Sequence, residues 1–140
     1  MLVQLIVAAI MVMTTVVIHG IGLAMLGRLL RRESHHEHMM HLPRISLRGL
    51  FVTLLAVIGM FGLHGLEIWL YALFYLIGGA IPSLETAVYF STISYAAIGF
   101  SDHYIVESWR LIAGIEGING AVLLGWSTAF FVTMVVRLER

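Results

Sequence analysis

The chain has 140 residues, of which 60% are hydrophobic and only 11% are charged, and its mean hydropathy is +0.97. Soluble domains are about half apolar and about a quarter charged, so this chain cannot cover itself with a water-facing surface. A net charge of zero argues against a nucleic-acid partner, and the absence of cysteine excludes disulfides and thiolate chemistry. The composition therefore predicts an all-α integral membrane protein with the lipid bilayer around it.

Three apolar runs are long enough for helices that cross a ~30 Å hydrocarbon core, which takes roughly 20 residues. We expect a peripheral N-terminal transmembrane helix in residues 1–31, an outer helix in 49–80 and an inner helix in 105–138. Residues 32–48 are expected to form a histidine-rich loop, and residues 49–140 a pore domain.

The arginines orient these spans. All of them except Arg110 flank the loop at 32–48 or follow the last apolar run. Because cytoplasmic loops carry the excess of Arg and Lys, the N-terminus is expected outside and the histidine-rich loop and the C-terminus inside. We expect a bacterial inner (plasma) membrane as the location.

The segment at 83–102 is too short and too interrupted for a further span, which predicts a re-entrant segment. Ser83 follows a proline and can cap a helix, and Glu85 in the first turn complements the helix dipole. The helix should end near Ala96, and a glycine-containing strand should then climb back out to Asp102. A span, a short helix, such a strand and a second span follow one another in pore-loop cation channels.

This segment resembles the pore helix and filter of the potassium-channel superfamily. The matching residues are Tyr89, Phe90, Ser91, Gly99 and Asp102, with Phe100 in place of Tyr. The resemblance extends over about residues 49–140, where the chain is similar to small bacterial ion channel proteins. It implies a re-entrant pore helix and filter loop between two membrane helices, and a homotetramer. The first apolar run adds a further helix to this minimum, so we expect three transmembrane helices per subunit. It also implies passive cation flux, with K⁺ as the default ion, K⁺ or Na⁺ in the filter and no required cofactor.

The resemblance also assigns a selectivity filter, and this filter departs from the family pattern. Its residues are Ala97, Ile98, Gly99, Phe100, Ser101 and Asp102. Ala97 stands where the family has Thr, so the innermost site loses its hydroxyl oxygens. Ser101 replaces a Gly whose backbone often has a positive φ, at a cost of about 1–2 kcal/mol. We expect K⁺ selectivity to be weak, because selectivity depends on the number and field strength of the coordinating oxygens.

Ionisable residues inside the apolar runs are candidates for function. His64 and Glu67 lie one turn apart in the second run, and Glu116 lies near Asn119 in the third. We expect Glu67 or Glu116 to hydrogen-bond the pore helix or His64 and so support the filter. Proton-linked gating and a di-metal carboxylate site are the alternatives. His19 is expected nearer the inner half of the first span, as a packed polar residue.

The loop holds a second group of candidates, the imidazoles of His35, His36, His38 and His41. They could bind a transition metal such as Zn²⁺, Ni²⁺ or Cu²⁺. They could also respond to pH, or belong to a solvated helical extension of the first span.

Glycines punctuate the last apolar run. The resemblance suggests Gly120 or Gly125 as a gating hinge, whereas close helix packing explains them equally well.

No enzyme motif is present in the sequence, so an enzyme is not expected. The alternative to a channel is a non-conducting metal-binding or sensory membrane protein that uses the same fold as a scaffold. A small secondary transporter is disfavoured, because the sequence shows no internal repeat.

Overall fold

The computed structural model describes residues 1–38, 47–99 and 102–138. The helices are α1 (Leu2–His38), α2 (Leu47–Ile77), α3 (Leu84–Tyr95) and α4 (Arg110–Leu138), with 3-10 turns at Asp102–Tyr104 and Glu107–Trp109. Within the described ranges every regular element is helical. Three segments are long and apolar enough to cross a membrane, namely Leu2–Leu30, Gly49–Ile77 and Glu107–Val136. The expected all-helical class with three spans is therefore confirmed.

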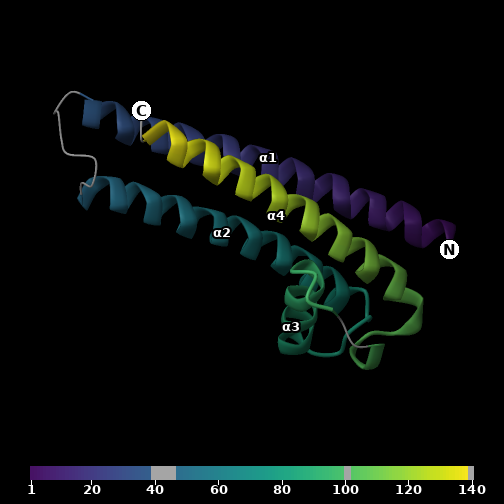
Figure 1. The fold of residues 1–140 in the computed structure, drawn as a ribbon. Coiled ribbons are helices and arrows are strands. Elements are labelled where there is room, and N and C mark those ends of the chain that lie inside the picture. Colours follow the sequence, from purple (N-terminus) through teal and green to yellow (C-terminus); the bar gives the residue numbers. More distant parts are fainter. Residues whose placement is uncertain (39–46, 100–101, 139–140) are drawn as a thin grey trace.

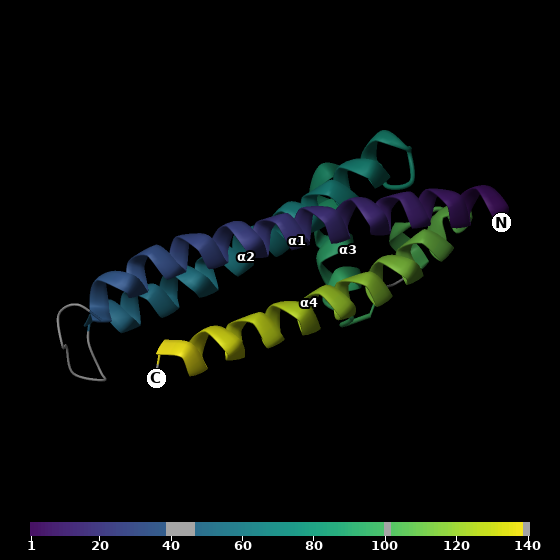
Figure 2. The ribbon, with the colours of Figure 1, turned by 90° about the horizontal axis from the view of Figure 1, so that it is seen from above.

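The long helices run side by side, with α1 and α4 pointing one way and α2 the other (Figures 1 and 2). The start of α1, the end of α2 and the start of α4 lie towards one end of the bundle. The end of α1, the start of α2 and the end of α4 lie towards the other. Helix α1 packs against both α2 and α4, which touch each other much less. Within one chain, α1 is thus the helix that joins the other two.

Two apolar cores hold the bundle together. The larger core includes Met11 of α1, Tyr75 of α2, Phe90 of α3 and Ala113 of α4, so it fixes α3 against all three long helices. The smaller core lies near the opposite end and contains Leu30, Val52 and Ala56, with Phe130 and Met134 packed against them. The buried polar residues described below lie within and beside these cores.

Helix α3 begins as the sequence predicts. The Ser83 side chain accepts a hydrogen bond from the backbone N–H of Thr86 (3.2 Å), and Glu85 lies in the first turn. This cap satisfies one of the backbone donors that a helix start leaves without a partner.

The chain after α3 differs from the prediction, because residues 97–99 form a turn and not a strand. The N–H of Ala97 donates to the Ser94 carbonyl (3.0 Å) and that of Ile98 to the Ile93 carbonyl (3.1 Å). Ala97 has φ 55° and Gly99 has φ 119°. This is the Schellman arrangement, in which the reversing chain satisfies the last carbonyls of a helix. Among the described residues no strand lies beside this segment, so the carbonyls at the end of α3 accept hydrogen bonds from its N–H groups.

The helix bounds also differ from the expected ranges. Helix α1 continues to His38, so the first residues of the expected loop are helical. Helix α2 ends at Ile77, and the chain turns at Gly79 with φ 70°. Helix α4 begins only at Arg110, because 3-10 turns occupy part of the segment before it.

Candidate functional site

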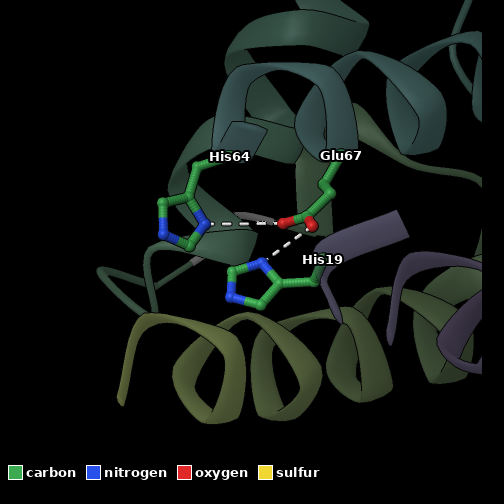
Figure 3. A group of neighbouring side chains, drawn as sticks. All are labelled: His19, His64 and Glu67. Carbon is green, nitrogen blue, oxygen red and sulfur yellow. Dashed lines mark hydrogen bonds and ion pairs between the residues drawn. The ribbon is translucent and has the colours of Figure 1, made fainter. Parts of the chain in front are cut away.

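The carboxylate of Glu67 lies at the centre of a buried polar group. His19 Nδ1 is 2.9 Å from Glu67 Oε1, and the Tyr95 hydroxyl donates to Oε2. His64 Nδ1 lies 3.4 Å from the same Oε2 and 3.0 Å from the Tyr95 hydroxyl. Figure 3 shows both imidazole rings turned towards the carboxylate, one from each side. Three helices therefore meet at this one carboxylate.

The far sides of both imidazoles face one hydroxyl. His64 Nε2 lies 2.9 Å from Ser127 Oγ, and His19 Nε2 lies 3.3 Å from it. His19 and Glu67 are fully buried, and the His64 side chain is 13% exposed. We call His19, His64, Glu67, Tyr95 and Ser127 the His19–Glu67 cluster. Because its members come from α1, α2, α3 and α4, it fixes all four helices at one level.

A second buried carboxylate has a different set of partners. The Tyr75 hydroxyl donates to Glu116 Oε2 (2.6 Å), and the Ser91 hydroxyl lies 2.5 Å from Oε1. Ser91 Oγ is also 3.0 Å from the carbonyl of Ile68. We call Tyr75, Ser91 and Glu116 the Glu116 cluster. It connects α2, α3 and α4 through hydroxyl groups alone.

Asn119 belongs to neither cluster. Its side-chain amide donates to Thr15 Oγ1 (2.8 Å), and it lies 3.4 Å from the Tyr71 hydroxyl. It therefore links α4 to α1 and approaches α2 between the two carboxylates.

The glycines of α4 divide into two kinds. A Cβ on Gly120 would overlap the Tyr95 carbonyl oxygen, and one on Gly117 would lie 3.1 Å from the Ser94 carbonyl oxygen. These residues let α4 approach the backbone at the end of α3. A Cβ on Gly125 would meet no atom within 4 Å. The packing explanation thus holds for Gly120, whereas Gly125 has no close neighbour in the chain.

The filter residues of the sequence analysis are only partly described. Ala97 and Gly99 lie in the turn after α3, and the Ile98 side chain is 76% exposed. Phe100 and Ser101 lie outside the described residues, and Asp102 begins a 3-10 turn. The expected row of carbonyls along an axis thus stays a prediction.

The structure does not test the expected metal site at the histidines of the loop. His35, His36 and His38 fall in the last turns of α1, and their side chains lie outside the described residues. His41 lies outside the described residues altogether. A metal site in this loop stays a prediction.

Sequence reasoning missed Tyr95 and Ser127, and it did not predict that the side chains of His19 and Glu67 are in contact. Helix α1 starts farther out along the bundle than α2 ends, so counting along each helix separately misjudges the relative depth (Figure 1). One signal was available, because a histidine in an apolar span needs a polar partner.

Comparison with known proteins adds the family. A family model described as "Ion channel" matches residues 63–137, more than half of the chain. The match includes His64, Glu67, α3 and nearly all of α4, and leaves out α1 with its His19. No curated protein and no solved structure matches the chain. With its three membrane-spanning helices, the chain therefore belongs to the ion channel family of the potassium-channel superfamily.

Proposed function

We propose that the protein is a homotetrameric pore-loop channel for passive flux of monovalent cations, with K⁺ as the default ion and poor discrimination against Na⁺. The observation that carries this proposal is the position of the inner end of α3. Tyr95, the last residue of α3, contacts Glu67 in the second half of α2, and its carbonyl lies against Gly120 of α4.

These contacts allow the depth of α3 to be measured along its neighbours. Glu67 precedes Ile77, the end of α2, by ten residues, which at 1.5 Å each is about 15 Å. Gly120 follows Arg110, the start of α4, by the same number, again about 15 Å. Half of a ~30 Å hydrocarbon core is also about 15 Å. This agreement supports a helix that enters the membrane from one side and stops near its middle.

A helix that stops there favours a cation at its end. The C-terminus of a helix carries a partial negative charge of roughly −0.5, which attracts cations. One copy of the turn after α3 cannot enclose an ion, so several copies must surround an axis. Apolar side chains are free for such contacts on α4, where Ile118 is 69% and Val122 is 61% exposed. Four copies are the number that the superfamily favours.

The same proposal places the chain in the membrane. With the positive-inside rule, the N-terminus lies outside, and the histidine-rich loop and the C-terminus lie in the cytoplasm of a bacterial cell. The end of α1 and the end of α4 lie at the same end of the bundle, which supports this placement (Figure 1). The filter comprises Ala97, Ile98, Gly99, Phe100, Ser101 and Asp102.

The test is flux into liposomes together with the oligomeric state in mild detergent. We expect a tetramer, flux of K⁺ and Na⁺ above that of empty liposomes, and little preference between the two ions. Gly99→Ala should abolish the flux, because φ 119° at this position strains any residue with a Cβ. Gly62→Ala is the matched control, since its Cβ would meet nothing within 4 Å.

Two outcomes would overturn the proposal. A monomer or dimer in mild detergent removes the axis that the pore requires. Absence of flux for every ion, together with tight binding of a transition metal, favours the non-conducting metal-binding protein instead.

A further inference from the structure

The three ligand-type side chains of the His19–Glu67 cluster already have the spacing of metal ligands. One donor atom each from His19, His64 and Glu67 lies within 4.8 Å of the other two. The His19–Glu67 and His64–Glu67 distances are 2.9 and 3.4 Å. A tetrahedral zinc ion with bonds of about 2.0–2.1 Å separates its ligand atoms by about 3.3 Å. The two His–Glu distances lie on either side of this separation.

The opposite nitrogens of the two imidazoles support the same arrangement. A histidine bound to metal through Nδ1 carries its hydrogen on Nε2 and donates it to a neighbouring oxygen. Both Nε2 atoms face Ser127 Oγ, at 2.9 and 3.3 Å. A hydroxyl oxygen has two lone pairs, so Ser127 can accept both hydrogens. Tyr95 donates to the carboxylate and so orients the third ligand.

Without a metal ion, the same groups have one hydrogen fewer than their hydrogen bonds require. The Glu67 carboxylate can only accept hydrogen bonds, and Tyr95 already donates its hydroxyl hydrogen to it. The Nδ1 atoms of His19 and His64 must therefore both carry a hydrogen in order to donate towards the carboxylate. Two neutral imidazoles then present two Nε2 acceptors to Ser127, which has a single hydroxyl hydrogen. Either an extra proton on one ring or a metal ion in place of both Nδ1 hydrogens completes the bonding.

We propose that His19, His64 and Glu67 bind a divalent transition metal ion of the Zn²⁺ class, and that the bound ion joins α1 to α2 beside the inner end of α3. Two imidazoles and a carboxylate suit Zn²⁺ and Co²⁺, whereas Mg²⁺ and Ca²⁺ prefer oxygen ligands throughout. His19 comes from α1, outside the segment that the family model matches. The site does not depend on whether the pore conducts.

The experiment first removes the competing histidines. A loop variant of the full chain carries four substitutions together, His35→Gln, His36→Gln, His38→Gln and His41→Gln. Of the seven histidines, it keeps His19, His64 and His103. After treatment with a chelator, this variant is titrated with Co²⁺ in detergent. We expect one ion per chain, the visible absorption of Co²⁺ with four or five ligands, and its displacement by Zn²⁺ but not by Mg²⁺.

Second substitutions in the loop variant locate the ion. His19→Gln should weaken Co²⁺ binding by at least about 100-fold, and Ser127→Ala by about 10–100-fold because it removes only the acceptor behind the two rings. His103→Gln is the matched control, an exposed histidine outside the cluster, and should leave the affinity unchanged. X-ray absorption of the Zn²⁺-loaded loop variant should show two imidazoles and oxygen, a result that requires no substitution in the cluster.

The proposal fails if the loop variant binds neither Co²⁺ nor Zn²⁺, in which case an extra proton completes the bonding of the cluster. It also fails if His19→Gln and Ser127→Ala bind as tightly as the loop variant. A zinc spectrum with fewer than two imidazoles would overturn it independently of the folding of any variant.

Discussion

Glu67 and Glu116 are both fully buried carboxylates that accept a hydrogen bond from a tyrosine and from α3, which for Glu67 is a single bond from Tyr95, yet their surroundings differ. Two imidazoles lie against Glu67, whereas hydroxyls alone donate to Glu116 among the described contacts. Imidazole can carry a positive charge and is the commonest side-chain ligand of transition metals, whereas a neutral hydroxyl carries no positive charge and suits these metals less well.

The comparison separates two ways of fixing one short helix. The Glu116 cluster holds the middle of α3 through Ser91, with no partner that changes its charge. The His19–Glu67 cluster holds the end of α3 through Tyr95, beside the two imidazoles that we propose as metal ligands. The end of α3 next to the expected filter is thus the part that a cation can influence. The following substitutions test that distinction.

The largest effect is expected for Glu67→Gln. It replaces a carboxylate that accepts from His19, His64 and Tyr95 by an amide whose NH₂ cannot accept, so a buried donor loses its partner, which costs about 1–3 kcal/mol and more where the lost acceptor is charged. The measurement is the free energy of unfolding in mixed micelles. The double variant with His19→Gln should lose little more than Glu67→Gln alone, because both remove one interaction. Additive losses would show that the two side chains act independently.

A smaller loss is expected for Gly120→Ala. Its Cβ would overlap the Tyr95 carbonyl oxygen and push α4 from the end of α3, an overpacking that typically costs about 1–3 kcal/mol. Gly125→Ala is the control, since its Cβ meets open space and alanine favours a helix by up to about 1 kcal/mol. The temperature of thermal unfolding and the flux should both fall for Gly120→Ala and should both be kept in Gly125→Ala. If flux instead stops only with Gly125→Ala, Gly125 is the hinge.

Glu116→Gln should cost about 0.5–1.5 kcal/mol, because the Gln Oε1 can still accept from Tyr75 and its NH₂ can donate to Ser91 Oγ, whose hydrogen then goes to the Ile68 carbonyl, so that only the strength of the hydrogen bonds to a charged acceptor is lost. The measurement is the free energy of unfolding in mixed micelles. Tyr75→Phe is the comparison, and it is expected to lose about 0.5–1.5 kcal/mol. Co²⁺ binding should be unchanged by Glu116→Gln. A loss of Co²⁺ binding would mean that the two clusters are not separate.

The smallest change is expected at Ala97. Its φ of 55° costs a residue with a Cβ roughly 1 kcal/mol, so Ala97→Gly should stabilise the protein by about that amount. Ala97→Thr should destabilise it, because a β-branched side chain tolerates this conformation poorly. Ala96 has φ −74°, so Ala96→Gly is a control that should not stabilise.

The flux assay adds a separate result for the same position. If Ala97→Thr, combined with Ser101→Gly, leaves the K⁺ to Na⁺ preference unchanged, the missing hydroxyl oxygens do not set selectivity.

Much of the fold could be predicted from the sequence. The charge-free runs predicted three long helices, because a backbone in hydrocarbon must satisfy its own hydrogen bonds. The Ser83 cap predicted where α3 begins, since this signal is local. The strand expected after Ala96 is not seen over residues 97–99, because the N–H groups of Ala97 and Ile98 donate to the last carbonyls of α3. The contact of Glu67 with α3 fits the expectation that a buried carboxylate there would bond this helix.

The sequence by itself thus determined the membrane class, the spans and the resemblance to the potassium-channel superfamily, since hydropathy and short motifs act through neighbouring residues. Only the tertiary structure decided that His19 meets Glu67, that Ser127 lies behind both imidazoles, and that Gly120 lies on the Tyr95 carbonyl. Each of these contacts joins residues of different helices. Their relative depth depends on how far one helix is shifted along another, a quantity set by side-chain packing between helices and not by the period of any one of them.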